Sequence, residues 1–420
     1  MPNAHSLGIA QREVINVARS IIESLQQDGA ACGYITTWAP TPGYFQLRGE
    51  LGLPAHRRRS VAIRELMTLA TVFGVVNCGG TDSRLPGLHL LTYCNRNDFR
   101  NGRFIDGYTS ISPDGHRVSA IAVSTDGFIP NVPIPGLTMV VPTRRFGNQY
   151  GREYSFRSVT EAVGQIVRDR AATQQFSGLF ISYEAQPFQH AAVLALSRVD
   201  QSIPTWGYLH SALPPVPTDL LYRLGAPKTL LVHGDEQARI AQEILGWPAD
   251  SVQVVQRLRR TQLGEIRQSR RIYLPYWCRN VAAIVSSLEA LLDSESHRMP
   301  IEIMPHPRQC NRATRQLERG IRKVVERRSL DSAGGGGTLP PDIFIGATAA
   351  VLDRLETSGE ALHICSDPLF ESYQEEIWGT VAVSQVLPQI FHYRLLVPRS
   401  LISGPEAEDL RPMFLGSNSP

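Results

Sequence analysis

Apolar positions near the start of the chain recur at helical spacing. Gly29 follows shortly after a series of aliphatic side chains at helical spacing: Ile9, Val14, Val17, Ile21, Ile22 and Leu25. This spacing predicts an amphipathic helix that ends at the glycine. A second helix is predicted over residues 60–73, beyond a loop-rich stretch. Residues 1–80 are therefore predicted to form a helical N-terminal extension.

From residue 87 onward the pattern changes to short apolar runs that alternate with amphipathic segments. This alternation is typical of β-α units on a mainly parallel sheet. We expect it to form an N-terminal Rossmann-like domain over residues 81–260. The predicted strands are 117–124, 137–142, 178–183, 203–209, 228–233 and 251–256, and the predicted helices are 157–171, 188–198 and 235–245.

A polar, arginine-rich segment (257–271) precedes a second series of the same kind. Its predicted strands are "IYLPYW", "IEIM", "DIFIG", "ALHIC" and "VAVSQVL", with helices over 280–293, 311–327 and 348–356. Four consecutive glycines at 334–337 predict a surface loop. We therefore expect a C-terminal Rossmann-like domain over residues 261–400 and a tail over 401–420.

The composition of the chain limits the classes of protein to which it can belong. The chain is 42% hydrophobic and 19% charged, which is ordinary for a globular protein, and its formal charge of +3 does not by itself favour nucleic acid. The six cysteines form no close pairs, so reduced thiols in a cytoplasmic protein are expected. We find no signal peptide and no apolar run near 18 residues, which excludes a spanning helix. We expect a cytoplasmic protein, at most attached peripherally to the inner membrane face.

Common nucleotide and metal motifs are absent from the sequence. There is no G-x-x-x-x-G-K-[ST], no G-x-G-x-x-G after a strand, no H-E-x-x-H and no DxD triplet. The sequence therefore gives little support to a P-loop fold or a dinucleotide-binding fold. We expect neither a cofactor nor a metal.

The stretch "PIEIMPHPRQC" (300–310) ends a predicted strand with His306 held between two prolines. Each proline fixes its own φ and biases the preceding residue toward extended backbone. The imidazole of His306 and the nearby guanidinium of Arg308 would thus be presented at the carboxyl end of the strand, where open α/β sheets bind ligands. The structural alternative is a turn with a solvated histidine.

Other loops of the second series would lie at the same sheet edge. Tyr276 follows the first strand and can flank a base. Gly346 allows close backbone approach, and Thr348 and Ala349 open a helix whose exposed amides attract an anion. With His306 and Arg308 these residues predict a site for a phosphate or nucleotide, although a threonine N-cap is usually structural.

The first series places polar residues after its own strands. Glu184 is the candidate general base, because partial burial raises a carboxylate's pKa toward working pH. The alternative is that it caps the following helix. His210 competes for the base role or binds substrate. The candidate substrate-binding residues are Asp98, Gln186, His190 and Ser211.

Several of these segments together resemble bacterial surface-carbohydrate glycosyltransferases of the GT-B fold. The resemblance rests on the "HPR" loop (306–308), on "GATAAVLDRLETSG" (346–359) followed by "HICSDPLF" (363–370), and on "GYLHSALPP" with a downstream "LGWP" in the first half. It covers about residues 87–400. The histidine-proline motif is similar to that of CMP-sugar enzymes, the sialyltransferases and Kdo transferases.

The resemblance implies two Rossmann-like domains that face a cleft. It implies transfer of a sugar from a nucleotide-sugar donor, with a CMP-activated acidic sugar favoured, to a glycan or lipid-linked acceptor. His306 would contact the donor phosphate and Thr348 would assist it. The acceptor-side Asp/Glu-Asp/Glu-Gly motif of sialyltransferases is missing, so the donor sugar and the base stay open.

Two other classes compete with this interpretation. The arginines of 257–271 and 311–327 could bind nucleic acid or anionic lipid headgroups, although no aromatic residues are interleaved and a solvated helix face is the simplest explanation. Nucleic acid is not favoured. A GT-B-type nucleotide-sugar epimerase is the further alternative.

Overall fold

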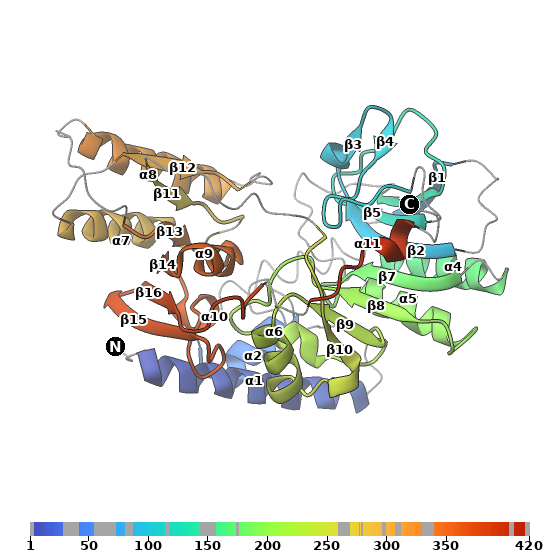
Figure 1. Ribbon diagram of the computed structural model, residues 1–420, viewed down its shortest axis with the longest axis horizontal. Coiled ribbons are helices and arrows are strands. Elements are labelled where there is room, and N and C mark those ends of the chain that lie inside the picture. Colours follow the sequence, from blue (N-terminus) through green and yellow to red (C-terminus); the bar gives the residue numbers. More distant parts are fainter. Residues whose placement is uncertain are drawn as a thin grey trace.

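The computed structural model describes most of the chain. The described residues are 4–27, 42–53, 73–79, 87–113, 118–142, 157–173, 176–258, 269–276, 278, 280–295, 300–306, 312–329, 340–402 and 407–415. They form two α/β halves that lie side by side, with a long helix along the base of both (Figure 1).

The first half is built on an eight-stranded sheet with the order β1-β6-β5-β2-β7-β8-β9-β10. All neighbouring pairs are parallel except β1 with β6. Without β1, the strands follow the 3-2-1-4-5-6 order of Rossmann folds plus one more strand, and the order reverses between β2 and β7. The strands are β1 (Phe73–Asn77), β2 (Gly87–Cys94), β5 (Val118–Ser124), β6 (Leu137–Pro142), β7 (Phe176–Ser182), β8 (Thr205–Tyr208), β9 (Thr229–Val232) and β10 (Val252–Val254).

Helices and a hairpin cover the two faces of this sheet. On one face α4 (Arg157–Ala172) and α5 (Pro187–Ser197) pack together on buried aliphatic residues of β2, β5 and β7. On the other face lie the hairpin of β3 (Phe99–Arg100) and β4 (Arg103–Phe104) and the C-terminal α11 (Arg411–Leu415). The segment predicted as a tail thus returns to the first half, where Phe414 meets Phe180 edge-on at 4.9 Å between ring centroids.

The second half has a six-stranded sheet with the order β12-β11-β13-β14-β16-β15. The first four strands are parallel in the 2-1-3-4 order of flavodoxin-like folds, which reverses between β11 and β13. An antiparallel hairpin completes the sheet. The strands are β11 (Arg270–Tyr273), β12 (Ile301–Met304), β13 (Ile343–Ile345), β14 (Glu360–Ile364), β15 (Val381–Leu387) and β16 (Ile390–Leu395).

Alternate residues of these strands point to different helices. Ile272, Ile343 and Ile345 belong to one cluster with α7 (Val281–Ser294) and α8 (Arg312–Ser329). Phe344 and Ala361 join a cluster with α9 (Ala350–Ser358), α10 (Pro368–Glu371) and side chains of the first half. The core is therefore continuous from one half to the other.

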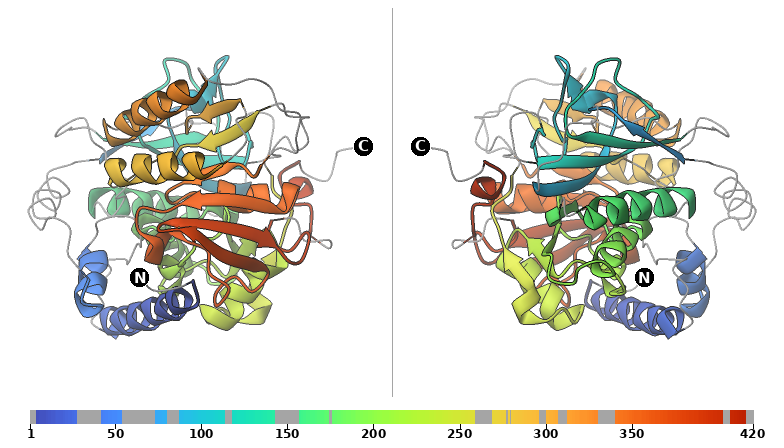
Figure 2. Two further views of the ribbon diagram at one scale, coloured as in Figure 1. Left: turned by 90° about the vertical axis from the view of Figure 1, so that its left-hand side faces the viewer. Right: turned by 90° about the vertical axis from the view of Figure 1, so that its right-hand side faces the viewer.

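The N-terminal helix α1 (Ala4–Gln27) crosses under both halves, and both views of Figure 2 show it at the base. Its Gln11 amide donates to the Ser372 carbonyl oxygen at 2.7 Å, and its Arg19 guanidinium donates to the Ile244 carbonyl oxygen at 2.6 Å. The second helix, α2 (Pro42–Glu50), lies beside it. None of the described helices is long and apolar enough to cross a membrane.

The halves are also joined by backbone packing at Gly234. A Cβ atom at this glycine would lie 2.4 Å from the Ser400 carbonyl oxygen and 2.5 Å from the Leu401 carbonyl carbon. The Glu236 N–H donates to the same Ser400 oxygen at 3.0 Å. A third link is the indole of Trp378, which donates to the Pro215 carbonyl oxygen at 3.1 Å.

The predicted α/β architecture, two Rossmann-like domains preceded by helices, is confirmed by these strand orders. Strand β1 lies inside the segment predicted as a helical extension and joins the first sheet. The predicted helix 235–245 is a short α6 (Asp235–Arg239) continued as a π-helix (Ile240–Ile244), and the strand β16 had no counterpart in the sequence prediction. Residues 60–72, 259–268 and 334–337 lie outside the described residues.

Substitution of Gly234 by alanine tests the junction between the halves. We expect it to lower the free energy of unfolding by about 1–3 kcal/mol, because the new methyl group meets backbone atoms that cannot move independently. The control is Gly49→Ala at an exposed position of α2, where no atom lies within 4 Å of a Cβ and helix propensity predicts a gain of up to about 1 kcal/mol. Equal denaturation curves for wild type and Gly234→Ala would contradict the prediction.

Candidate functional site

The order of the first sheet reverses between β2 and β7, and strained backbone follows β7 at that point. Ala185 has a φ of 52° although it carries a Cβ and is buried. Backbone strain of this kind costs about 1–3 kcal/mol and is concentrated at functional sites. It fixes the direction in which the chain presents the preceding residue, Glu184.

The side chain of Glu184 contacts that of His210, which follows β8. The Glu184 Oε1 and His210 Nε2 atoms are 3.1 Å apart, and the two side chains are 26% and 15% exposed. The imidazole also meets the ring of Tyr108 edge-on, with centroids 4.1 Å apart. The structure thus brings two of the predicted catalytic residues together in a partly shielded position that solvent still reaches.

Two further carboxyl groups lie near this pair. Burial raises the pKa of Asp106, although hydrogen bonds from Thr109 and Thr92 counteract the shift. Burial also raises the pKa of Asp219 well above its usual value, and the neighbouring charge of Glu184 adds to the effect. Asp219 and Glu184 thus lie close enough for the charge of one to affect the other.

Gln186 and His190, predicted as substrate contacts, are engaged within the protein. Gln186 is the N-cap of α5, and its N–H donates to the side chain of Gln189 at 3.0 Å. His190 is buried between the Leu224 carbonyl oxygen at 2.8 Å and the Tyr183 hydroxyl at 2.9 Å. Burial lowers its pKa to about 4, so the ring is neutral and matches this donor and acceptor.

The remaining predicted substrate contacts differ in accessibility. The Asp98 side chain is buried and accepts from the Asn95 N–H at 2.8 Å in a capping box that follows β2. Ser211 is exposed next to His210. Asp98 thus stabilises its own loop. Ser211, in contrast, is accessible beside the Glu184–His210 pair.

In the second half the strand order reverses between β11 and β13. Two buried side chains form hydrogen bonds with the turn that follows β13. Gly346 has a φ of 65°, a conformation that favours glycine. Its carbonyl oxygen accepts from His363 Nε2 at 2.7 Å, and the Thr348 carbonyl oxygen accepts from the Tyr373 hydroxyl at 3.3 Å. Because both carbonyl groups bond to buried side chains, the turn has one fixed orientation.

His363 is suited to this task because it is neutral. Burial lowers its pKa to about 4. The unprotonated Nδ1 atom accepts from the Tyr393 hydroxyl at 3.2 Å, while Nε2–H donates to the turn. The Thr348 hydroxyl accepts from the Ala350 N–H at 3.3 Å, but the N-cap of α9 is Ala349 and not Thr348 as predicted. The helix therefore starts at Ala350, two residues after the start of the predicted helix 348–356.

The predicted donor-side aromatic residue lies against the predicted histidine. The rings of Tyr276, after β11, and His306, after β12, meet edge-on with centroids 5.5 Å apart. Both side chains are half-buried. Arg308 lies outside the described residues. The structure thus places Tyr276, His306 and the turn 346–349 after three neighbouring strands of one sheet.

The loop after β14 contains a buried acid. The Glu371 carboxylate accepts from the Ser366 N–H at 2.7 Å and from the Ser366 hydroxyl at 2.8 Å. Burial raises the pKa of Glu371 to about 7, against the opposing effect of these hydrogen bonds. Within the described ranges, no three histidine, cysteine or acidic side chains gather closely enough to hold a metal ion.

Comparisons with known proteins give only distant likenesses. No protein-family model matches the chain, and no curated protein matches it either. Among solved structures, the chain is similar to a glycosyltransferase from Rickettsia africae, with 9% identity, a TM-score of 0.33, and coverage of 66% of this chain and 79% of that one. It is also similar to the lipopolysaccharide outer core galactosyltransferase WaaB in its apo form, with 7% identity, a TM-score of 0.29, and coverage of 57% and 66%. These likenesses are weak, so the fold is assigned from the strand order of this chain itself.

Several residues of the two sites carried no signal in the sequence. Tyr108 and Asp219 come from loops far along the chain from Glu184, and no spacing rule joins them. His363 belongs to the segment 363–370 that was singled out, and Tyr373 follows it, but their hydrogen bonds to the turn depend on the packing of β14 and α10.

Glu371 should make stability depend on pH. Its pKa rises from 4.5 to about 7 on folding, so between these values the folded state binds more protons than the unfolded state. The free energy of unfolding should therefore fall by up to about 3 kcal/mol as the pH rises from 4.5 to about 7. Above this window Glu371 should cause no further change. Urea unfolding at pH 5 and pH 8 should show this fall in wild type and a smaller one in Glu371→Gln. The exposed Glu243→Gln is the control, and an equal fall in all three proteins would contradict the assignment.

Proposed function

We propose that the protein is a glycosyltransferase that uses a nucleotide-sugar donor. The observation that carries the proposal is that each sheet has candidate chemistry at the point where its strand order reverses, and that the two kinds of chemistry are complementary. One such point holds the Glu184–His210 pair, and the other holds the turn at Gly346 beside Tyr276 and His306. Ligands of open α/β sheets bind at these reversal points.

The second half supplies what a leaving nucleotide requires. As the bond between the anomeric carbon of the sugar and the phosphate oxygen breaks, the nucleotide keeps the electron pair and its phosphate gains charge. His306 and the amide groups that open α9 would stabilise that charge, and the edge-on contact with Tyr276 restrains the imidazole in advance. This pre-orientation is the role we propose for the two prolines that flank His306.

The first half supplies what an acceptor requires. Glu184 takes the proton of the acceptor hydroxyl as the acceptor oxygen forms the new bond to the anomeric carbon of the sugar. His210 donates to the carboxylate and so fixes its orientation. Ser211 is the accessible side chain beside the pair and is proposed to contact the acceptor. His190, Gln186 and Asp98 support the surrounding loops.

The finer assignment concerns the substrates. We propose a CMP-activated acidic sugar as donor, on the similarity of the histidine-proline motif, and a glycan or lipid-linked acceptor. The His306 and α9 amide groups neutralise a phosphate without a divalent ion, so the proposed transfer needs no metal.

Replacement of His306 by alanine tests the donor site. Calorimetric titration of the wild type with CMP, CDP, UDP, GDP and ADP should show selective binding of one nucleotide. The affinity should fall about 10- to 100-fold in His306→Ala, because a charge-assisted hydrogen bond to phosphate is lost. Transfer should be abolished while the melting temperature stays unchanged.

The matched control for this experiment is His5→Ala, which removes a histidine that is 77% exposed on α1. It should bind nucleotide as the wild type does. If none of the five nucleotides binds, the donor site does not exist; if His306→Ala turns over normally, His306 has no part in it.

Substitution of Glu184 by glutamine tests the proposed base. Turnover should fall about 10²- to 10⁴-fold, the usual contribution of a general base, with nucleotide affinity unchanged. The exposed Glu243→Gln should keep full turnover. A large loss of nucleotide affinity in Glu184→Gln, with turnover at saturation retained, would instead make Glu184 a donor-binding residue.

A further inference from the structure

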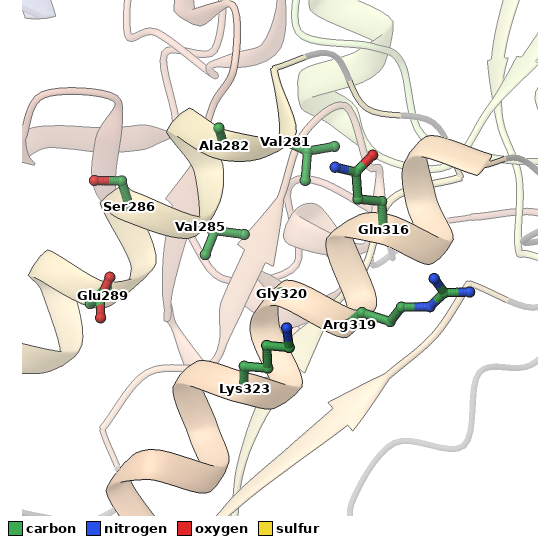
Figure 3. A pocket seen from close by; sticks show the side chains of 9 residues that line it. All are labelled: Val281, Ala282, Val285, Ser286, Glu289, Gln316, Arg319, Gly320 and Lys323. Carbon is green, nitrogen blue, oxygen red and sulfur yellow. The ribbon is translucent and has the colours of Figure 1, made fainter.

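The helices α7 and α8 enclose a groove that the proposed reaction does not use. Its volume is about 510 Å³, and Figure 3 shows side chains of both helices along it. Val281 and Val285 of α7 form an apolar floor, and Arg319 and Lys323 of α8 stand along the opposite side. The groove lies on the outer layer of the second half (Figure 1).

The floor of the groove is formed by a close approach of the two helices. A Cβ atom at Gly320 would lie 2.8 Å from Val285 Cγ2, so only glycine allows this contact without displacement of the valine. Val281 and Val285 are both half-buried, and their remaining apolar surface faces solvent in the groove. Such a surface is stabilised when an apolar ligand removes it from water.

The charge of the groove is not neutralised by the protein. Glu289 is the acidic residue of the lining, and it forms an ion pair with Arg327 at 2.9 Å. In the part of the chain that the structure describes, the side chains of Arg319 and Lys323 have no ion-pair or hydrogen-bond partner. They are four residues apart on α8 and therefore lie on the same side of the helix.

We propose that this groove binds a phosphate-bearing lipid at the surface of an anionic bilayer. Arg319 and Lys323 would hold the headgroup phosphate, and Val281 and Val285 would contact the apolar part of the lipid. The surroundings favour the same partner, because α8 carries seven basic and two acidic residues and so adds attraction to an anionic surface. The proposal is independent of the proposed transfer reaction.

The groove fits lipid better than nucleic acid. None of its lining residues is aromatic, so it offers no platform on which a base can stack. A nucleic-acid backbone would use the two cations but leave the apolar floor in water. An amphiphilic anion uses both.

The test is flotation of the full chain with phosphatidylcholine vesicles, with and without one quarter of phosphatidylglycerol. Binding should require phosphatidylglycerol. The double variant Arg319→Gln/Lys323→Gln should bind these vesicles about 30-fold more weakly, since each basic residue at an anionic surface contributes about 1 kcal/mol. Val281→Ser should weaken the binding that persists at high salt, where charge attraction is screened.

The matched control is Arg198→Gln/Arg411→Gln, which removes two exposed arginines from the first half. It should bind vesicles as the wild type does, and all variants should keep the wild-type melting temperature.

Three outcomes would overturn the proposal. The first is equal loss of binding in the control and the groove variant, which would mean that net charge alone acts. The second is equal binding of vesicles by the groove variant and the wild type. The third is loss of vesicle binding when inorganic phosphate or duplex DNA is added at concentrations too low to screen charge. That result would mean that the groove binds a soluble phosphate or nucleic acid instead of lipid.

Discussion

Parallel strand pairing is the constraint on which the candidate sites depend. Parallel strands place all their carboxyl ends at one edge of a sheet, and the helices that return the chain cover both faces. The edge is therefore where loops can gather around a ligand, and it opens most where the strand order reverses. In this chain that rule selects Glu184 in the first sheet and the turn at Gly346 in the second.

The loops at these edges are held by buried groups rather than by regular structure. Neutral His363 and the Tyr373 hydroxyl fix the carbonyl groups of the 346–348 turn, and neutral His190 holds the chain near Glu184 through Tyr183. Burial keeps both histidines uncharged, so each can donate with one nitrogen and accept with the other. The sites thus depend on the core beneath them, and that core is shared by the two halves.

The two surfaces assigned to ligands differ in construction. The proposed catalytic groups sit on loops tied to buried partners, which suits a reaction that needs fixed geometry. The α7–α8 groove has exposed cations beside an apolar surface, which suits the surface of a bilayer, where many lipid positions are equivalent. Gly320 and the Glu289–Arg327 pair create that groove, and neither feature concerns the sheet edges.

The sequence by itself determined the element types and most of the candidate loops. Apolar periodicity is a local property, so it located α1, the alternating strands and helices of both halves, and the proline-flanked His306. Tertiary structure alone decided that β1 and α11 join the first half, that β16 lies between β14 and β15 in the second sheet, and that Tyr108, Asp219 and His363 belong to the sites. These features depend on strand pairing and burial between residues far apart in the chain, and the spacing of residues along a sequence carries no record of such contacts.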